Sequence, residues 1–346
     1  MRRFAGKAFR RIVRHAPSLA SFGARHCGEF LFRPGTVRHE QMGRNLRAAF
    51  PERSDGEIES LIRATARSTT QYMIEQLELD YVPPAELPAF VRRSAVFSGL
   101  EHLEAALDSP RPVVVYTPHY NNFAMACLLL VLQAAPRKSV SIFFNPPEKN
   151  PYAPRMRRLI ENLDCGAQAL HNDRGGLMKA FRALHKGGLV GIMPDVFDYE
   201  AGTILVPFFG RFAFAMTGTA FLARKYEATL LPLYAHRLRT GRFEIRVEPP
   251  IEIVQTADLE HDTWHATAAI FRNMEEHLRR DPEHWMYWDT FLGRVYPNVP
   301  VPSDAAEWER SLATLSGKLW ARSPLAELVQ ELNARRTPTS SEETAA

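Results

Sequence analysis

Short, apolar, β-rich runs alternate with helical stretches over the middle of the chain, and this alternation limits the possible folds more than any other feature. The apolar runs lie at 111–122, 138–147, 188–195, 229–238 and 242–253. The stretches of helical period lie at 123–134, 152–164, 175–187 and 217–228. Strands that alternate with helices of about 10–15 residues form parallel sheets covered by helices. We therefore predict an α/β fold with a mixed, largely parallel sheet flanked by helices.

The chain before about residue 90 is predicted to be mostly helical. Residues 55–78 have the pattern of one helix, with Ser54 as its N-cap and acidic residues in its first turn. Residues 2–14 carry an apolar stripe among arginines, which is typical of a helix on anionic membrane and also fits a helix packed on its own domain. Residues 1–33 hold eight Lys or Arg and a single acid, Glu29. We predict that residues 1–33 contact an anionic membrane surface.

Three segments follow from these patterns. Residues 1–40 form a basic amphipathic helical segment, residues 41–300 form the α/β domain, and residues 301–346 form a helical extension with a polar, disordered tail. The longest apolar run, 123–136, is shorter than the roughly 20 residues that cross a bilayer, and we expect neither a membrane span nor a signal peptide. The cationic stretch lacks a recognised nucleic-acid motif. We therefore expect a peripheral or cytoplasmic protein with no nucleic-acid partner.

Polar side chains follow two of the predicted strands, at the edge of the sheet where α/β proteins bind ligands. His119 follows the first apolar run, and histidine titrates near neutral pH, as a general base should. Asp195 ends the run at 188–195, where it is predicted to orient the imidazole, bind substrate or cap a turn. Asn121 and Asn122 either donate to an oxyanion or close the turn. No organised set of ligands indicates a metal site, and no cofactor is expected.

Two further features are candidate substrate contacts. The segment 206–216 is rich in phenylalanine, and its Phe208 and Phe209 are either packed core or a wall against which an acyl chain lies. Arg174, at the start of a predicted helix, is a candidate partner for a phosphate group of a substrate or carrier. Alternatively, Arg174 lies on a solvated face of that helix.

Six segments, taken in order along the chain, resemble the late acyltransferases of lipid A biosynthesis, within the lysophospholipid acyltransferase superfamily. They are MGRNLRAAFP (42–51), FSGLEHLEAAL (97–107), VVVYTPHYNNFA (113–124), RALHKGGLVGIMPD (182–195), TILVPFFGRFAFAMTGTAFLARK (203–225) and RRDPEHWMYW (279–288). The resemblance covers roughly residues 40–295 and implies an acyltransferase-like domain. It also implies transfer of a fatty acyl group from an acyl thioester, on acyl carrier protein or coenzyme A, to a glycolipid hydroxyl at the cytoplasmic face of the inner membrane.

The hallmark of that family is a His followed five residues later by Asp or Glu, and the resemblance implies that His119 is this His. In the family scheme the His removes the proton of the acceptor hydroxyl while the acid orients its ring. This chain has Ala124 at the position of the acid. It also has Asp289 where the family commonly carries another His.

Three interpretations fit a chain that keeps the base and lacks the acid. In the first, another carboxylate, Asp195 or Glu75 of the helix 55–78, replaces the acid in space and the acceptor is a hydroxyl. In the second, the acceptor is an amine, which attacks a thioester without prior deprotonation. In the third, the chain is catalytically degenerate and serves as a lipid- or acyl-carrier-binding module. We predict an acyltransferase that acts on a lipid or amine acceptor, with the binding module as the alternative.

Overall fold

The computed structural model describes residues 16–148, 153–195 and 203–296. Its centre is a seven-stranded sheet made of β1 (Ala95–Ser98), β2 (Val113–Tyr116), β3 (Val140–Phe144), β4 (Gln168–His171), β5 (Leu189–Ile192), β8 (Thr229–Arg239) and β9 (Arg242–Val247). The strand order is β1-β9-β8-β2-β5-β3-β4, and every neighbouring pair is parallel except β8 with β9. The predicted mixed, largely parallel sheet is therefore confirmed.

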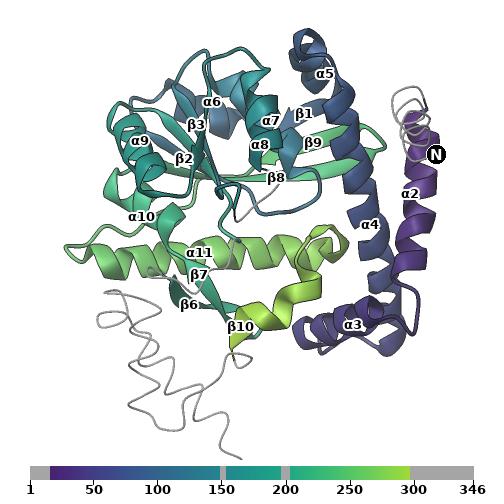
Figure 1. Cartoon of the computed structure of the whole chain (residues 1–346). Coiled ribbons are helices and arrows are strands. Elements are labelled where there is room, and N and C mark those ends of the chain that lie inside the picture. The colour runs from purple at the N-terminus through teal and green to yellow at the C-terminus, as the bar shows by residue number, and fades with distance from the viewer. Residues whose placement is uncertain (1–15, 149–152, 196–202, 297–346) are drawn as a thin grey trace, which may run out of the picture.

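Helices cover both faces of this sheet (Figure 1). One layer consists of α5 (Leu87–Ser94), α6 (Leu100–Asp108), α7 (Phe123–Ala134) and α8 (Ala153–Glu161). The other consists of α9 (Arg174–His185), α10 (Gly218–Lys225) and α11 (Leu259–Arg280). Strand β2 shows why two layers are needed, because its residues alternate between them. Val113 and Val115 belong to the core under α7, whereas Val114 and Tyr116 belong to the core above α11.

A second, three-stranded antiparallel sheet is built from β6 (Thr203–Phe208), β7 (Arg211–Met216) and β10 (Val295–Tyr296). The turn between β6 and β7 is Phe209–Gly210, and both residues have positive φ, as a two-residue hairpin turn requires. The indole nitrogen of Trp264 in α11 donates to the carbonyl oxygen of Leu205 in β6 at 3.1 Å. The phenylalanine-rich segment is thus a hairpin that is held against α11.

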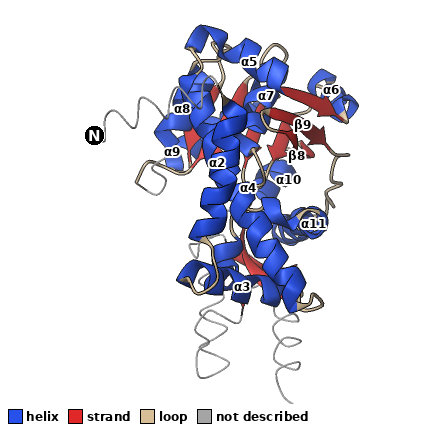
Figure 2. Ribbon diagram, turned by 90° about the vertical axis from the view of Figure 1, so that its right-hand side faces the viewer, coloured by secondary structure: helices blue, strands red, loops and turns tan. Residues whose placement is uncertain are grey.

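The N-terminal part consists of α2 (Pro17–Leu31), α3 (Val37–Ala49) and α4 (Asp55–Tyr81). The N-cap predicted at Ser54 is confirmed and is part of a capping box, because the Ser54 hydroxyl accepts from the Glu57 backbone and the Glu57 carboxylate accepts from the Ser54 backbone. Helix α2 packs along α4 as the outermost helix on this side of the molecule (Figure 2). The helix predicted at 2–14 and the extension at 301–346 lie outside the described residues.

The sequence placed most of the central elements correctly but not all of them. Strands β1, β4, β6, β7 and β10 and helices α6 and α11 were not predicted as separate elements. Short 3-10 turns, η1 (Pro84–Glu86), η2 (Pro282–His284) and η3 (Trp288–Arg294), connect the remaining elements. Among the helices that the structure describes, none is long and apolar enough to cross a membrane.

Candidate active site

The structure brings His119 and Asp195 together at the carboxyl edge of the large sheet. Strands β2 and β5 are parallel neighbours in which Tyr116 pairs with Ile192, so the residues three positions further along each chain emerge side by side. The His119 ring nitrogen Nδ1 lies 2.8 Å from Asp195 Oδ1. The backbone N–H of His119 also donates to Asp195 Oδ2 at 2.7 Å. The carboxylate therefore holds both the ring and the main chain of His119.

A third group, the indole of Trp285, completes the surroundings of Asp195. Its Nε1–H donates to Asp195 Oδ2 at 3.0 Å, and the carboxylate is fully buried. Burial alone would raise the pKa of Asp195, but the charge of His119 and the hydrogen bonds from His119 and Trp285 together lower it below its ordinary value. Because the ionised carboxylate only accepts hydrogen bonds, Nδ1 of His119 carries a proton and Nε2 is the nitrogen that can accept one.

A short antiparallel contact fixes the loop that carries His119. Tyr120 forms a β-bridge with Trp285, the Asn121 N–H donates to the His284 carbonyl at 2.8 Å, and the Met286 N–H donates to the His119 carbonyl at 3.1 Å. The segment that follows α11 thus positions the base through its main chain and the acid through Trp285. Sequence reasoning found this segment only as part of a resemblance and missed the role of Trp285.

Aromatic rings flank the imidazole on two sides. The Phe123 ring lies edge-on at a centroid distance of 4.8 Å, and the Tyr287 ring lies at 4.9 Å. The His119 side chain remains 14% exposed, and among the described residues its Nε2 has no hydrogen-bond partner. The arrangement leaves one nitrogen of a tightly held imidazole open to an incoming proton donor.

Glu75, the other carboxylate predicted to replace the missing acid, belongs to a different network. It is buried and accepts two hydrogen bonds from Arg237, at 2.7 and 2.9 Å. It also accepts from Gln71 and from Asn122, each at 3.2 Å. The hydrogen bond of the His119 ring therefore goes to Asp195, while Glu75 neutralises the partly buried Arg237.

The two asparagines after His119 have different surroundings. Asn122 is the N-cap of α7, because its Oδ1 accepts from the Met125 N–H and from Gln76 Nε2, both at 3.1 Å. Asn121 has a positive φ of 49°, is 1% exposed, and has no hydrogen-bond partner for either side-chain polar atom. Its substrate contact stays a prediction.

The remaining predicted contacts lie apart from the imidazole. Phe208 and Phe209 are buried in an aromatic cluster, where the Phe208 ring lies 5.9 Å from Trp285 between centroids. Phe208 therefore packs on the indole that holds Asp195. Arg174 is exposed at the first residue of α9. Among the described residues, no group of three or more His, Cys, Asp or Glu side chains is arranged to hold a metal ion.

Comparison with known proteins gives a consistent set of relatives. The sequence model of a family described as bacterial lipid A biosynthesis acyltransferase matches residues 1–290. A lipid A biosynthesis acyltransferase of Haemophilus influenzae is 21% identical over 70% of this chain and 72% of its own length. Two Escherichia coli proteins are also similar. The lipid A biosynthesis myristoyltransferase is 23% identical over 67% of this chain and 69% of its own length. The lipid A biosynthesis palmitoleoyltransferase is 25% identical over 78% of this chain and 82% of its own length.

Proposed function

The chain belongs to the bacterial lipid A biosynthesis acyltransferase family, and from this membership and the His119–Asp195 pair we propose that it transfers a fatty acyl group from an acyl thioester to a hydroxyl of a lipid A precursor. That the chain is an acyltransferase follows from the family. The donor, on acyl carrier protein or coenzyme A, and the acceptor are the proposed parts. The observation that carries the proposal is the 2.8 Å contact between an accessible imidazole and a buried carboxylate.

In the proposed reaction His119 is the general base. Its Nε2 takes the proton of the acceptor hydroxyl while that oxygen attacks the thioester carbonyl carbon. The tetrahedral intermediate then expels the thiolate, which takes the same proton from the imidazolium, so that an ester and a free thiol are formed. Asp195 remains ionised throughout and stabilises the imidazolium at the step where positive charge appears on the ring. Asn121, with an unpartnered buried carboxamide two residues from the base, is the proposed donor to the oxyanion.

The surroundings of Asp195 support the hydroxyl acceptor over the amine. An amine attacks a thioester without prior deprotonation, so it gains little from an imidazole that a buried carboxylate holds in place. A hydroxyl needs such a base. The alternative, a binding module without turnover, gives no reason for a buried acid to hold an open imidazole through one hydrogen bond to its ring and another to its backbone.

We also propose that the enzyme works at an anionic membrane surface through its N-terminal region, and the composition of α2 supports this. The residues that α2 buries against α4 are small, namely Ala20, Ser21, Ala24 and Gly28. Its outer face carries Phe22 and Phe30, which are 61% and 62% exposed. A helix that serves only its own domain buries its large apolar residues. In α2 the large apolar residues are exposed instead, and several arginines precede the helix in the sequence. This combination fits contact with lipid.

Thiol release from acyl thioesters tests the proposed reaction. Donors on acyl carrier protein and on coenzyme A are offered with and without a lipid A precursor. We expect thiol release that requires the acceptor. The rate should fall by at least about 100-fold in His119→Ala, which removes the general base, and in Asp195→Asn, which removes the carboxylate that orients it. His185→Ala, which changes an exposed histidine of α9, is the matched control.

The other outcomes each overturn the proposal. Unchanged turnover in His119→Ala would remove His119 from the mechanism. Release without any acceptor would indicate a thioesterase. No release from any donor, with folded protein, would indicate the binding module.

A further inference from the structure

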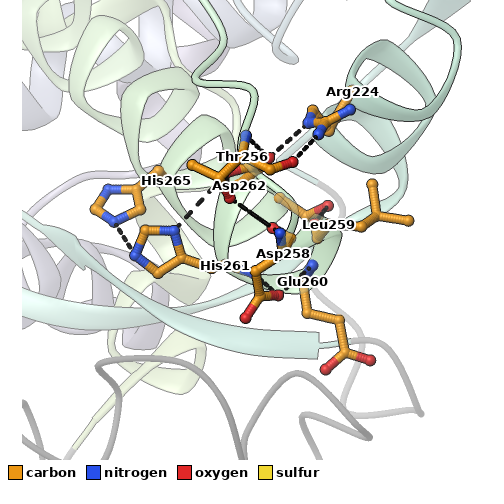
Figure 3. A network of polar contacts seen from close by, with 9 residues as sticks. Arg224, Thr256, Asp258, Leu259, Glu260, His261, Asp262 and His265 are labelled. Carbon is orange, nitrogen blue, oxygen red and sulfur yellow. Dashed lines mark hydrogen bonds and ion pairs between the residues drawn. The ribbon is translucent and has the colours of Figure 1, made fainter.

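Helix α11 carries two histidines, His261 and His265, in its first two turns. They are four positions apart, so they lie on the same face of the helix. Their Nε2 atoms are 3.0 Å apart, and their ring centroids are 4.3 Å apart. Figure 3 shows the two rings next to each other at the surface of α11. The proposed acyl transfer makes no use of this pair, which leaves its role open to explanation.

A carboxylate on the other side of the His261 ring sets the protonation of the pair. Asp262 is fully buried, and its Oδ1 lies 3.8 Å from His261 Nδ1. A carboxylate at this place favours a proton on Nδ1, as the partners of metal-binding histidines do. The Nε2 atom of His261 then has a free lone pair, and it accepts the hydrogen bond that His265 Nε2 donates.

The position of this carboxylate is fixed by groups outside the pair. Arg224 in α10 donates to Asp262 Oδ2 at 2.7 Å, and the backbone and hydroxyl of Thr256 donate to the carboxylate at 2.7 and 2.8 Å (Figure 3). The neighbouring Trp264 donates to the carbonyl of Leu205 at 3.1 Å. This turn of α11 is therefore anchored to α10 and to β6, and the two imidazoles project from a rigid base.

The separation of the two nitrogens suits one metal ion between them. Imidazole nitrogens bind such ions at about 2.0–2.1 Å, and two nitrogens 3.0 Å apart at that distance enclose an angle of about 95° at the ion. This is close to the right angle between neighbouring ligands in tetragonal coordination and well below the tetrahedral angle. Among ions that imidazole binds, Cu²⁺ and Ni²⁺ prefer the tetragonal arrangement, and Cu²⁺ forms the more stable complexes.

We propose that His261 and His265 together chelate one divalent transition-metal ion, with Cu²⁺ held most tightly. The ion replaces the proton between the two Nε2 atoms, and the exposed His265 ring carries its proton on Nδ1 instead. Water supplies the remaining ligands, since no third His, Cys, Asp or Glu in the described part of the chain completes the set. The site braces the start of α11, whereas Trp285, the partner of Asp195, follows the opposite end of that helix.

Titration of the full chain with Cu²⁺ tests the proposal. The ion is supplied as its glycine complex, which suppresses binding to single side chains, and calorimetry follows the natural protein, His261→Ala and His265→Ala. We expect either substitution to weaken copper binding by at least about tenfold, because a second ligand on the same helix no longer acts at high effective concentration. His185→Ala, which removes an exposed histidine of α9, is the control and should bind as the natural protein does.

Electron paramagnetic resonance of the copper-loaded protein counts the coordinated nitrogens. We expect two imidazole nitrogens in the natural protein and at most one in either variant. Copper affinities equal in the natural protein and both variants would overturn the proposal, and so would a natural protein whose spectrum shows a single nitrogen. Should His261→Ala fail to fold, His265→Ala decides alone, because its side chain is exposed.

Discussion

At the scale of single residues, Asp195 is the group on which the site depends. It is fully buried and receives hydrogen bonds from the His119 ring, the His119 backbone and the Trp285 indole. A buried carboxylate is tolerated only when such donors replace its lost hydration. The low pKa of Asp195 is therefore a property of its three partners, and the loss of any one of them weakens the orientation of the base.

Ala124→Glu, which restores the carboxylate common in the family, tests whether the site still has room for that residue. Ala124 is fully buried in the first turn of α7, and His119 already has its acid in Asp195. We expect the variant to lose about 3 kcal/mol of unfolding free energy, because an uncompensated charge enters the core, and to gain no activity. Urea unfolding and thiol release measure the two effects.

Ala124→Ser is the control for that experiment, because it changes the same position to a small polar residue that carries no charge. We expect it to change stability by less than about 1 kcal/mol. A clear rise in turnover of Ala124→Glu would contradict our assignment and show that Asp195 is not an adequate partner for His119.

The sequence was sufficient to nominate His119 and Asp195 but insufficient to pair them. Each follows a predicted strand, yet only the strand order, with β2 beside β5, makes them neighbours. Glu75 remained a second candidate because no linear pattern shows that Arg237, 162 positions away, neutralises it. Trp285 gave no local signal at all, since its indole acts across 90 positions of sequence.

At the scale of elements, the contact between α2 and α4 depends on close approach. A Cβ atom at Gly28 would lie 2.5 Å from the Ala66 carbonyl oxygen and from Thr70 Oγ1. The small residues that α2 turns inward let the two backbones come together, and the Gln71 side chain donates to Ser21 Oγ at 2.8 Å across the contact. The periodicity of α4 predicted that helix from the sequence. The packing of α2 could not be predicted in the same way, because its larger apolar residues lie on its outer face and not on the buried one.

Gly28→Val should separate α2 from α4. The added methyl groups meet backbone that cannot yield, so we expect a loss of about 1–3 kcal/mol and faster proteolysis of the segment before residue 36. Gly23→Val is the control on the same helix, because nothing lies within 4 Å of a Cβ at that position. Equal stability of the two variants would mean that α2 does not pack on α4 as described.

At the scale of the whole molecule, the candidate active site and the exposed face of α2 belong to different parts of the fold. The large sheet and the segment after α11 hold the His119–Asp195 pair, whereas α2 forms an outer surface that its own domain does not cover. In the proposed reaction, a thioester donor and a lipid acceptor have to meet at one enzyme. An enzyme that lies on the membrane with its N-terminal side and keeps its sheet edge accessible meets this requirement without a spanning helix in the described part of the chain.

The double variant Phe22→Ser/Phe30→Ser tests this orientation with the full chain and vesicles of phosphatidylethanolamine and phosphatidylglycerol. We expect the natural protein to sediment with these vesicles less strongly as salt rises, because the basic N-terminal residues attract the anionic lipid. The double variant should bind at least about tenfold more weakly, since both rings leave the apolar phase. Val96→Ser/Val254→Ser, which changes two exposed apolar residues outside α2, should bind as the natural protein does. If the two double variants bind equally well, the outer face of α2 does not contact lipid, and the charge of residues 1–33 alone accounts for any attachment.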